Sequence, residues 1–526
     1  MVEVDIIQAF NQGLEHVISL VQNLSEQASS LENQNQNLSE QLSSLQNQNQ
    51  GLSEQVNTLQ NQNQGLSEQV STLQNQNQNL SEQISSLQNQ NQELESRVEK
   101  LEVQVQKTSK NSSKPPSTDG FKKTQSLRKP SGAKPGGQKG HKGSTLEQSE
   151  TPDEVIIHDI TSCLECGTSL EEVEPIKTIK RQVFDIPKQE TVVTEHQVTV
   201  KICPNCGFKN QAQFPDNVTQ PVQYGVNITT TAVYLNQYQF IPYKRMQELF
   251  MELFYLAISQ GTLVNMVKRT YELLEPIESY IKSQLIVASV AHFDETGLYV
   301  IKSRWWLHST SNSSYTFYFP HQKRGQEAID AIGILPVFKG TAIHDCWASY
   351  FGYEDCTHAI CNAHNLREGR AMIELHNQEW AKQMNQLLID AKTFSESNAY
   401  PLSPVAIDEF NKRFERIIEQ GYRENPLKEG EKNTDPVRFL NRLSKRQEEV
   451  LEFLHQRDVP FDNNQAERDI RMVKGKQKVS GTFRAEEGAK HFSRIRGVIS
   501  TIKKQGKNVF ESLSGVISGS KPMPID

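Results

Sequence analysis

The first hundred residues carry a leucine at every seventh position. If these leucines occupy heptad position d, position a alternates between asparagine and an aliphatic residue, as at Asn49, Val56, Asn63 and Val70. An apolar period of 3.5 residues kept over many heptads predicts a left-handed coiled coil. The d-position residues are Leu24, Leu31, Leu38, Leu45, Leu52, Leu59, Leu66, Leu73, Leu80, Leu87, Leu94 and Leu101.

This heptad pattern also predicts the assembly. Aliphatic residues at a with leucine at d favour two parallel helices, and a buried asparagine at a pairs best with its counterpart in a dimer. We expect residues 24–105 to form a rod on the order of 120 Å long in a homodimer or a higher oligomer. The Gln- and Asn-rich composition also fits a disordered tract, which the unbroken leucine register argues against.

Residues 216–285 have the pattern of helices. Within them, 242–268 contains an apolar helix, a break at 259–262, and a second helix with a capping signal. This spacing is typical of a DNA-binding helix–turn–helix, and an ordinary helical hairpin fits it as well.

From residue 287 the pattern changes to short strands, as in 287–301 and 340–345. Three consecutive strands, a helical connection and a further strand predict the start of a ribonuclease-H-like sheet. Asp294 is expected at the end of the first strand, and Asp345 directly after the strand at 340–344. Carboxylates at the ends of adjacent strands offer the hard oxygen ligands that Mg²⁺ prefers.

Holding two such ions for phosphoryl chemistry requires a third carboxylate. Asp462 and Asn463 make a helix start, which puts Glu467 in the first turns of that helix. Arg471 and Lys474 follow at i+4 and i+7, on the same face. A carboxylate beside two cations suits a phosphate next to a metal ion, although each acid taken alone also fits a solvated surface residue.

Two C-x-x-C-G knuckles predict a structural zinc site, because two such knuckles complete a tetrahedral shell of four thiolates. The residues between them, 180–201, have the Val and Thr content of strands, as in a zinc ribbon. Disulfides are the alternative, which the absence of a secretory signal disfavours. The four expected ligands are Cys163, Cys166, Cys203 and Cys206.

Charge is segregated along the chain, whose net charge is −7. Residues 107–142 hold ten Lys or Arg and one Asp, a net +9, among prolines and glycines, which predicts an unfolded basic linker. Residues 466–507 hold twelve Lys or Arg and four acids, a net +8. Both segments suit a phosphate backbone. No apolar run approaches the roughly 18 residues of a membrane span, so we expect no membrane association.

Several motifs resemble those of the insertion-sequence-66 family of bacterial transposases. They are HFDETG (292–297), HDCWASY (344–350), CNAHNLRE (361–368), DNNQAERDIRMVK (462–474) and the stretch 480–513. SSKPPSTDG, KPGGQKGHKG and the two cysteine knuckles match the N-terminal half of the same family, so the resemblance covers about residues 108–515.

The resemblance implies that Asp294, Asp345 and Glu467 form a DDE triad that binds two Mg²⁺ ions. It implies that Lys474 is the family's basic residue after the glutamate. From the motif C-x-A-H-x-x-R, it implies that His364 and Arg367 lie near the site and contact DNA, as Arg471 and Lys474 would. The residues 369–455 would be a helical insertion.

The sequence therefore predicts a multidomain α/β protein with an N-terminal α coiled coil, a small zinc-ribbon-like domain and a ribonuclease-H-like catalytic core. The expected divisions are coiled coil 1–107, basic linker 108–150, zinc domain 151–215, helical region 216–285, DDE domain 286–480 with the insertion, and basic C-terminal region 481–526.

We expect a DDE transposase that binds the ends of an insertion sequence and catalyses Mg²⁺-dependent cleavage and strand transfer. Its expected partners are double-stranded DNA and accessory proteins of the same element, and its expected location is the bacterial cytoplasm, with the nucleoid. A zipper-dimer zinc regulator that only binds DNA and a metal-dependent nuclease without strand transfer are the alternatives.

Overall fold

The computed structural model describes residues 11–108, 146–426 and 432–521, and in addition the single residues Ile7, Asn111, Gly140, Met523, Ile525 and Asp526. Most of the predicted basic linker at 108–150, with the motifs SSKPPSTDG and KPGGQKGHKG, lies outside the described residues. The chain divides into two units, Met1–Val105 and Gln106–Asp526. In the described ranges, no helix combines the length and the apolar composition needed to cross a bilayer.

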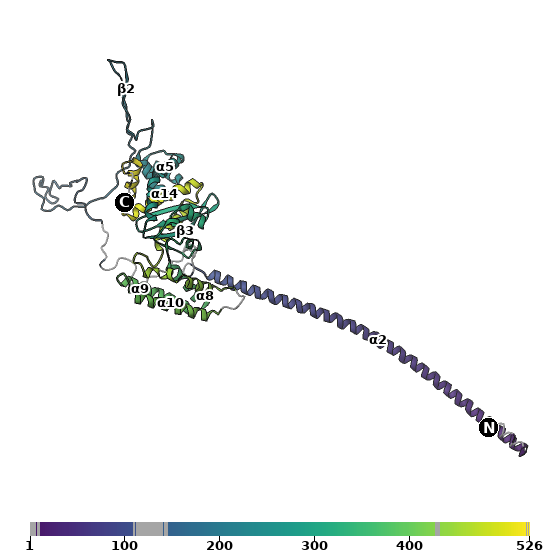
Figure 1. The fold of residues 1–526 in the computed structure, drawn as a ribbon. Coiled ribbons are helices and arrows are strands. Elements are labelled where there is room, and N and C mark those ends of the chain that lie inside the picture. The colour runs from purple at the N-terminus through teal and green to yellow at the C-terminus, as the bar shows by residue number, and fades with distance from the viewer. Residues whose placement is uncertain are drawn as a thin grey trace. The chain divides into compact units, whose positions relative to one another are not determined.

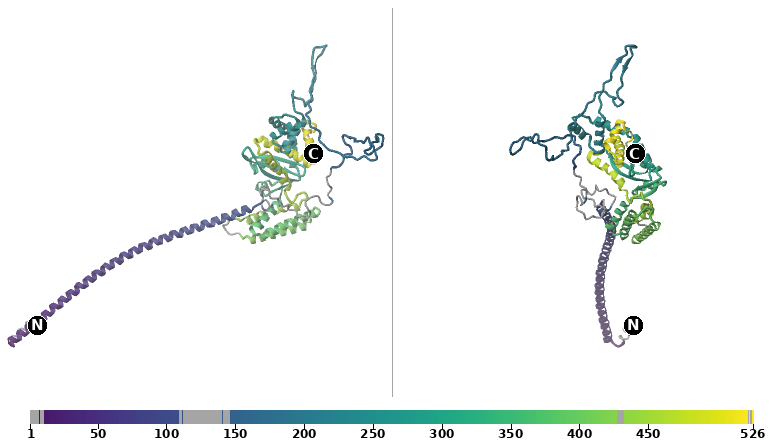
Figure 2. Two further views of the ribbon diagram at one scale, coloured as in Figure 1. Left: turned by 180° about the vertical axis from the view of Figure 1, so that it is seen from behind. Right: turned by 90° about the vertical axis from the view of Figure 1, so that its left-hand side faces the viewer.

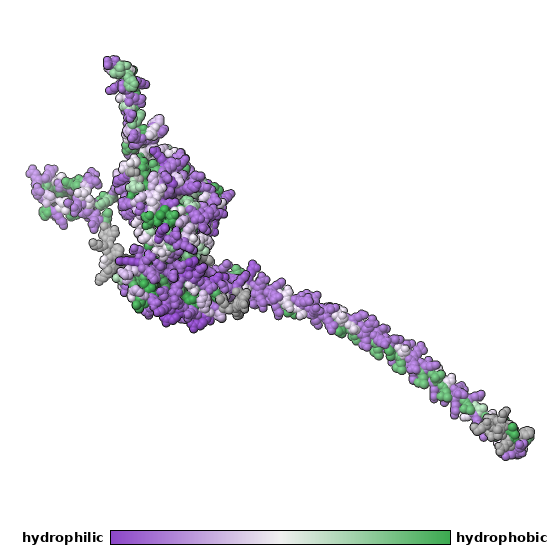
Figure 3. Space-filling view, in the orientation of Figure 1, coloured by the Kyte–Doolittle hydropathy of each residue, from purple (hydrophilic) through white to green (hydrophobic). Residues whose placement is uncertain are grey.

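The first unit is dominated by helix α2 (Leu14–Gln106), a single helix of 93 residues (Figure 1). All of its residues are described, and none of them is buried. The exposed fraction of the d-position leucines from Leu31 onward lies between 52% at Leu101 and 61% at Leu38. Figure 3 shows hydrophobic residues recurring along the visible side of this helix. An apolar stripe of this length gains stability only when a partner surface covers it.

The second unit is built on one five-stranded sheet. Its strands are β3 (Val290–Val300), β4 (Ser303–Ser311), β5 (Thr316–His321), β6 (Thr341–His344) and β7 (Thr357–Ile360). The order is β5-β4-β3-β6-β7, with antiparallel pairing from β3 to β5 and parallel pairing of β6 with β3 and with β7. The first four strands lie where the sequence predicts them, and β7 is an additional strand.

Two apolar clusters hold helices against this sheet. One joins Phe293 and Phe317 to α6, α7, α14 and α15, and the other joins Leu298 and Trp305 to α13. The bounds of these helices are α6 (Glu275–Ile286), α7 (Gln326–Ile332), α13 (Asn464–Ser480), α14 (Glu486–Lys504) and α15 (Val509–Ser518). Burial of large aromatic side chains supplies much of the stability of such a core.

Preceding the sheet are α3 (Val226–Val233), a π-helical turn (Tyr234–Tyr238), α4 (Tyr243–Phe254) and α5 (Gln260–Leu273). Helix α4 ends at Tyr255 in the left-handed conformation, and Ser259 caps α5 by accepting a hydrogen bond from the Thr262 N–H at 3.0 Å. The break between the two helices therefore falls at 255–259, slightly before the predicted 259–262, and Gln260, Gly261 and Thr262 form the first turn of α5.

The helical insertion packs around Trp380, Phe414 and Leu440 in a cluster that also includes Ile343 of β6 and Ile360 of β7. Its helices are α8 (Asn362–His376), α9 (Glu379–Ser397), α10 (Pro404–Glu424), α11 (Asp435–Lys445) and α12 (Gln447–Leu451). In both Figure 1 and Figure 2, the green helices α8, α9 and α10 lie together at one end of the sheet.

The strands expected across 180–201 are not formed. In the described range 146–225, the strands are β1 (Val200–Ile202) and β2 (Lys209–Gln211), which pair antiparallel. Val183 and Val193, which the strand pattern would place in a sheet, are 92% and 89% exposed. The expectation was wrong because strand propensity reflects packing on a half-buried surface, and this segment has no apolar surface to pack against.

We predict that a fragment of residues 20–106 is a parallel dimer, because its exposed leucine stripe is the surface that a second copy would cover. Sedimentation equilibrium should give twice the chain mass, and helicity should fall on dilution through the association range. A monomeric fragment with concentration-independent helicity would contradict the prediction.

Candidate active site

Asp294 and Asp345 lie on neighbouring parallel strands. The pairing of β3 with β6 aligns His292 with Ile343, and the same register continued by two residues aligns Asp294 with Asp345. Neighbouring strands are about 4.8 Å apart, so the two carboxylates lie side by side where β6 ends. The sequence predicted Asp294 at the end of its strand, and this was wrong. Asp294 lies within β3, which continues to Val300 by pairing with β4.

The two aspartates share a crowded, poorly solvated environment. Burial raises the pKa of Asp294 well above its ordinary value, and the nearby charges of Glu295, Asp345 and Glu467 raise it further. Burial, together with the charge of Glu295, also raises the pKa of Asp345. Carboxylates that oppose one another's ionisation in this way are stabilised by a bound cation.

Glu467 lies in the first turn of α13, where it meets three basic side chains. Its Oε1 is 3.0 Å from Nη2 of Arg367 and 3.9 Å from Nε2 of His364, and its Oε2 is 3.3 Å from Nη2 of Arg471. Burial and the adjacent Arg367 lower the pKa of His364. Three of the four predicted DNA contacts thus surround Glu467, whereas Lys474 donates from Nζ to the Gly297 carbonyl oxygen of β3.

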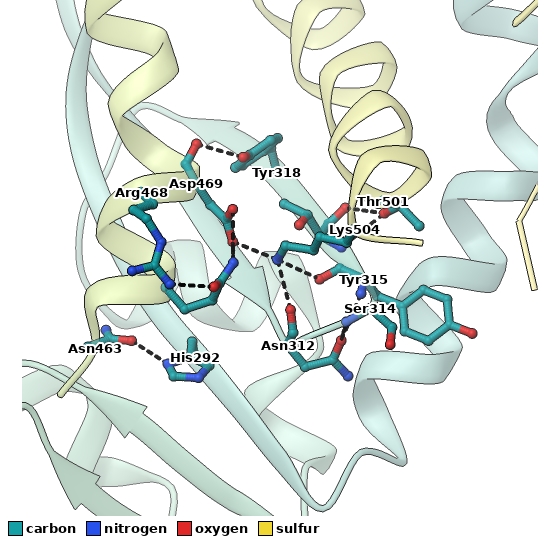
Figure 4. Close-up of polar contacts among 12 residues, drawn as sticks. His292, Asn312, Ser314, Tyr315, Tyr318, Asn463, Arg468, Asp469, Thr501 and Lys504 are labelled. Atoms are coloured by element: carbon teal, nitrogen blue, oxygen red, sulfur yellow. Dashed lines mark hydrogen bonds and ion pairs between the residues drawn. The ribbon is translucent and has the colours of Figure 1, made fainter. Parts of the chain in front are cut away.

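The start of α13 is fixed to the sheet by buried hydrogen bonds. Asp462 Oδ1 accepts from the Asn464 N–H at 3.1 Å, in the turn that leads into the helix, whose N-cap residue is Asn463. Asn463 Nδ2 donates to the Phe293 carbonyl oxygen at 2.9 Å, and its Oδ1 lies 2.7 Å from Nδ1 of His292 (Figure 4). These contacts hold Glu467 beside the strand that carries the first aspartate.

A buried ion pair anchors the middle of the same helix. Asp469 Oδ2 is 2.7 Å from Nζ of Lys504 on α14, and the exposed fractions of the two side chains are 12% and 11%. Lys504 also donates to the carbonyl oxygens of Asn312 and Tyr315, and the Tyr318 hydroxyl donates to the carbonyl oxygen of Asp469 (Figure 4). Helix α13 is therefore tied to α14 and to the strand connection after β4.

The sequence analysis did not identify Glu295 and Arg324 as part of this site. Glu295 is almost fully buried, pairs with Nε of Arg324 at 2.5 Å and accepts a hydrogen bond from the Tyr350 hydroxyl. Arg324 also lies 3.8 Å from Asp345. The available signal was a second acidic residue directly beside Asp294 in the same strand, and nothing local marks Arg324 as its partner.

Each cysteine knuckle adopts the turn that its sequence predicts. The Cys163 N–H donates to the Thr168 carbonyl oxygen at 2.8 Å, and the Cys203 N–H donates to the Phe208 carbonyl oxygen at 2.9 Å. The glycine that follows each knuckle has a positive φ, +76° in the first and +70° in the second. Hydrogen bonds from Thr168 lower the pKa of Cys166 to about 7, which favours the thiolate that binds metal.

All four knuckle cysteines are free thiols, which leaves the disulfide alternative without support. Throughout the part of the chain that the structure describes, no group of three or more His, Cys, Asp or Glu has the arrangement of a metal site. Each cysteine pair therefore has its turn, but the two pairs do not lie together. Arginines pair with the carboxylates Glu295, Asp345 and Glu467.

Comparison with known proteins gives three family matches. Residues 221–491, just over half of the chain, match the family described as the transposase IS66 family, and residues 161–207 match the zinc-finger binding domain of transposase IS66. Residues 11–147 match a family of unknown function.

A curated relative is an uncharacterized protein, y4jO, of Sinorhizobium fredii (strain NBRC 101917 / NGR234), with 33% identity over 104 residues. The matched segment covers 20% of this chain and 30% of that protein, so the chain spans less than a third of the relative's length.

We predict that Asp469→Asn lowers the free energy of unfolding by about 3 kcal/mol, because it leaves the buried ammonium of Lys504 without its counter-charge. Denaturant titration of the full chain measures the change. Asp408→Asn is the matched control, since Asp408 also pairs with a lysine, at 2.6 Å, but is 58% exposed. That control should change stability little, and equal losses in both variants would contradict the anchoring role.

Proposed function

The chain belongs to the IS66 family of transposases, and from this premise we propose that it is a DDE transposase acting on the ends of its own insertion sequence. Asp294, Asp345 and Glu467 would be the catalytic carboxylates. The reaction would be Mg²⁺-dependent cleavage of a DNA strand and joining of the resulting 3′-OH end to a target. It would take place in the bacterial cytoplasm, at the nucleoid.

The sheet supports a ribonuclease-H-like core. Three antiparallel strands are followed by two parallel ones, in the order β5-β4-β3-β6-β7, and the second aspartate follows the first parallel strand. The first four of these strands are those that the strand pattern of the sequence predicted, and helices α13 and α14 pack on the sheet.

The observation that carries the proposal is the electrostatic crowding at Asp294. Its pKa is raised by burial and by the charges of Glu295, Asp345 and Glu467, so a bound cation would relieve the repulsion among these carboxylates. Aspartate and glutamate oxygens are the ligands that Mg²⁺ prefers. The donor set therefore fits divalent ions in its ligand chemistry.

When bound, Mg²⁺ would activate water or a 3′-OH and stabilise the leaving oxygen. The protein's own groups would position the DNA. Arg367 and Arg471, which neutralise Glu467 here, have the forked donors that bind phosphate. His364 is near enough to Glu467 and Asp345 for both charges to affect its pKa. Fixed charges of this kind stabilise an in-line transition state without rearranging.

The remaining regions support binding to DNA and self-association. The net +8 of residues 466–507 suits a phosphate backbone. The exposed leucine stripe of α2 would pair two chains, and the knuckle thiols would bind one structural Zn²⁺ when the two pairs meet. Accessory proteins of the same element remain part of the proposal.

A regulator that only binds DNA, or a nuclease that cuts without joining, would use the same domains. Incubating the protein with Mg²⁺, a DNA end of its own element and a plasmid target separates these functions. Joined product supports the transposase, cut ends without joined product support a nuclease, and binding alone supports a regulator.

We predict that the reduced protein contains one zinc ion per chain and that Cys203→Ala loses it, because three thiolates leave the tetrahedral shell incomplete. Metal analysis of freshly purified protein measures the content. Cys356→Ala is the control, since Cys356 lies outside both knuckles, and it should retain the zinc. Wild-type protein without zinc would contradict the prediction.

We predict that Glu467→Gln retains DNA binding but lowers Mg²⁺-dependent cleavage and joining by about a hundredfold or more. A neutral amide is a poor Mg²⁺ ligand, and metal stabilisation of the transition state is worth several kcal/mol. Asp462→Asn is the matched control, because asparagine caps a helix about as well as aspartate does.

Both rates are measured on the same end-containing DNA, with thermal unfolding of each variant as the check on folding. A Gln variant that still cuts while the Asn variant does not would assign the role to Asp462 instead.

A further inference from the structure

Two arginines and two tryptophans alternate along the border of the candidate active site, and we call them the Arg–Trp ladder. The guanidinium carbon of Arg304 lies 4.6 Å from the ring centroid of Trp306. The guanidinium carbon of Arg324 lies 5.0 Å from the same centroid and 3.8 Å from the centroid of Trp347. Each contact is within the distance at which a cation is attracted to an aromatic face.

One end of the ladder touches the catalytic carboxylates. The Trp347 N–H donates to Asp345 Oδ1 at 2.9 Å, and Nη2 of Arg324 lies 3.8 Å from Asp345 Oδ2. Trp306 is paired across the sheet with Gly297, three residues beyond Asp294 on β3. Its ring therefore lies on the sheet face of Phe293 and Glu295, opposite to that of Asp294, so Asp345 is the carboxylate that the ladder reaches.

The exposure of these two rings is unusual within this chain, which has four tryptophans. Trp305 and Trp380 are core residues, 6% and 0% exposed, whereas Trp306 is half-buried and Trp347 is 36% exposed. The contact of Trp347 with Asp345 uses the backbone N–H and does not need an indole ring. The indole at this position is thus available to stack on a ligand.

We propose that the Arg–Trp ladder binds unpaired nucleotides of the DNA strand at the active site, with a base stacked on Trp347 and phosphates held by Arg304. The proposal rests on the proposed function, because it takes DNA as the substrate. Alternating rings and cations suit a single strand, whose bases expose their faces, whereas a duplex covers those faces with neighbouring base pairs. Duplex binding would need the cations alone.

Fluorescence anisotropy of the full chain tests the proposal, with Ca²⁺ in place of Mg²⁺ and at one fixed salt concentration. The probes are a labelled oligothymidine of about 20 nucleotides and a duplex of the same length. Trp347→Ala should weaken binding of the single strand about tenfold and leave duplex binding within about twofold. Trp347→Phe, which keeps a stacking ring, should bind the single strand nearly as wild type does.

Equal weakening on both probes, or no weakening on the single strand, would overturn the proposal. Thermal unfolding midpoints within about 3 °C of wild type show that the variants are folded. Strand cleavage by the same wild-type preparation separates the two proposals. If the wild type cleaves DNA but Trp347→Ala binds the single strand as the wild type does, only the ladder proposal is rejected. If Trp347→Ala weakens single-strand binding as predicted but the wild type does not cleave, only the transposase function is rejected.

Discussion

The side chain of Asn463 joins two parts of the candidate site that lie about 170 residues apart in sequence. The Phe293 carbonyl can only accept, so the amide nitrogen of Asn463 must face it and the amide oxygen must face His292. His292 then donates from Nδ1 as the neutral tautomer, consistent with burial lowering its pKa. The Asn463 N–H reaches the sulfur of Cys361, just before α8. Because an unpaired buried polar group costs about 1–3 kcal/mol, this set of bonds selects one position for the helix that carries Glu467.

Opposite charges meet around that helix. Four acidic side chains meet three arginines there: Asp294, Glu295, Asp345 and Glu467 with Arg324, Arg367 and Arg471. The arginines pair with Glu295, Asp345 and Glu467 and offset part of the repulsion, whereas Asp294 still has a raised pKa. The same guanidinium groups bind phosphate well. Metal cations bound to the carboxylates and DNA phosphates bound to the arginines would therefore neutralise both sets of charges.

Local patterns were sufficient to predict part of this arrangement. The strands of the two aspartates follow from their apolar residues, and the helix start at Asp462 puts Glu467 in its first turn. The residues that contact these side chains cannot be predicted from local patterns, because the contacts depend on packing between elements distant in sequence. Arg324, 29 residues after Glu295, and the bond from Lys474 to the Gly297 carbonyl oxygen have no signature at short range.

The same distinction separates the core from the regions around it. The sheet and its helices bury large apolar side chains within one chain, so their sequence specifies their structure directly. Helix α2 leaves every one of its residues unburied, and the two cysteine pairs have formed turns without a shared metal site among the described residues. For these two regions the missing stabilisation would come from a second chain and from a metal ion. Binding of a second chain and of zinc would couple the folding of these regions to assembly, and their stability would then depend on protein concentration and on zinc, unlike that of the core.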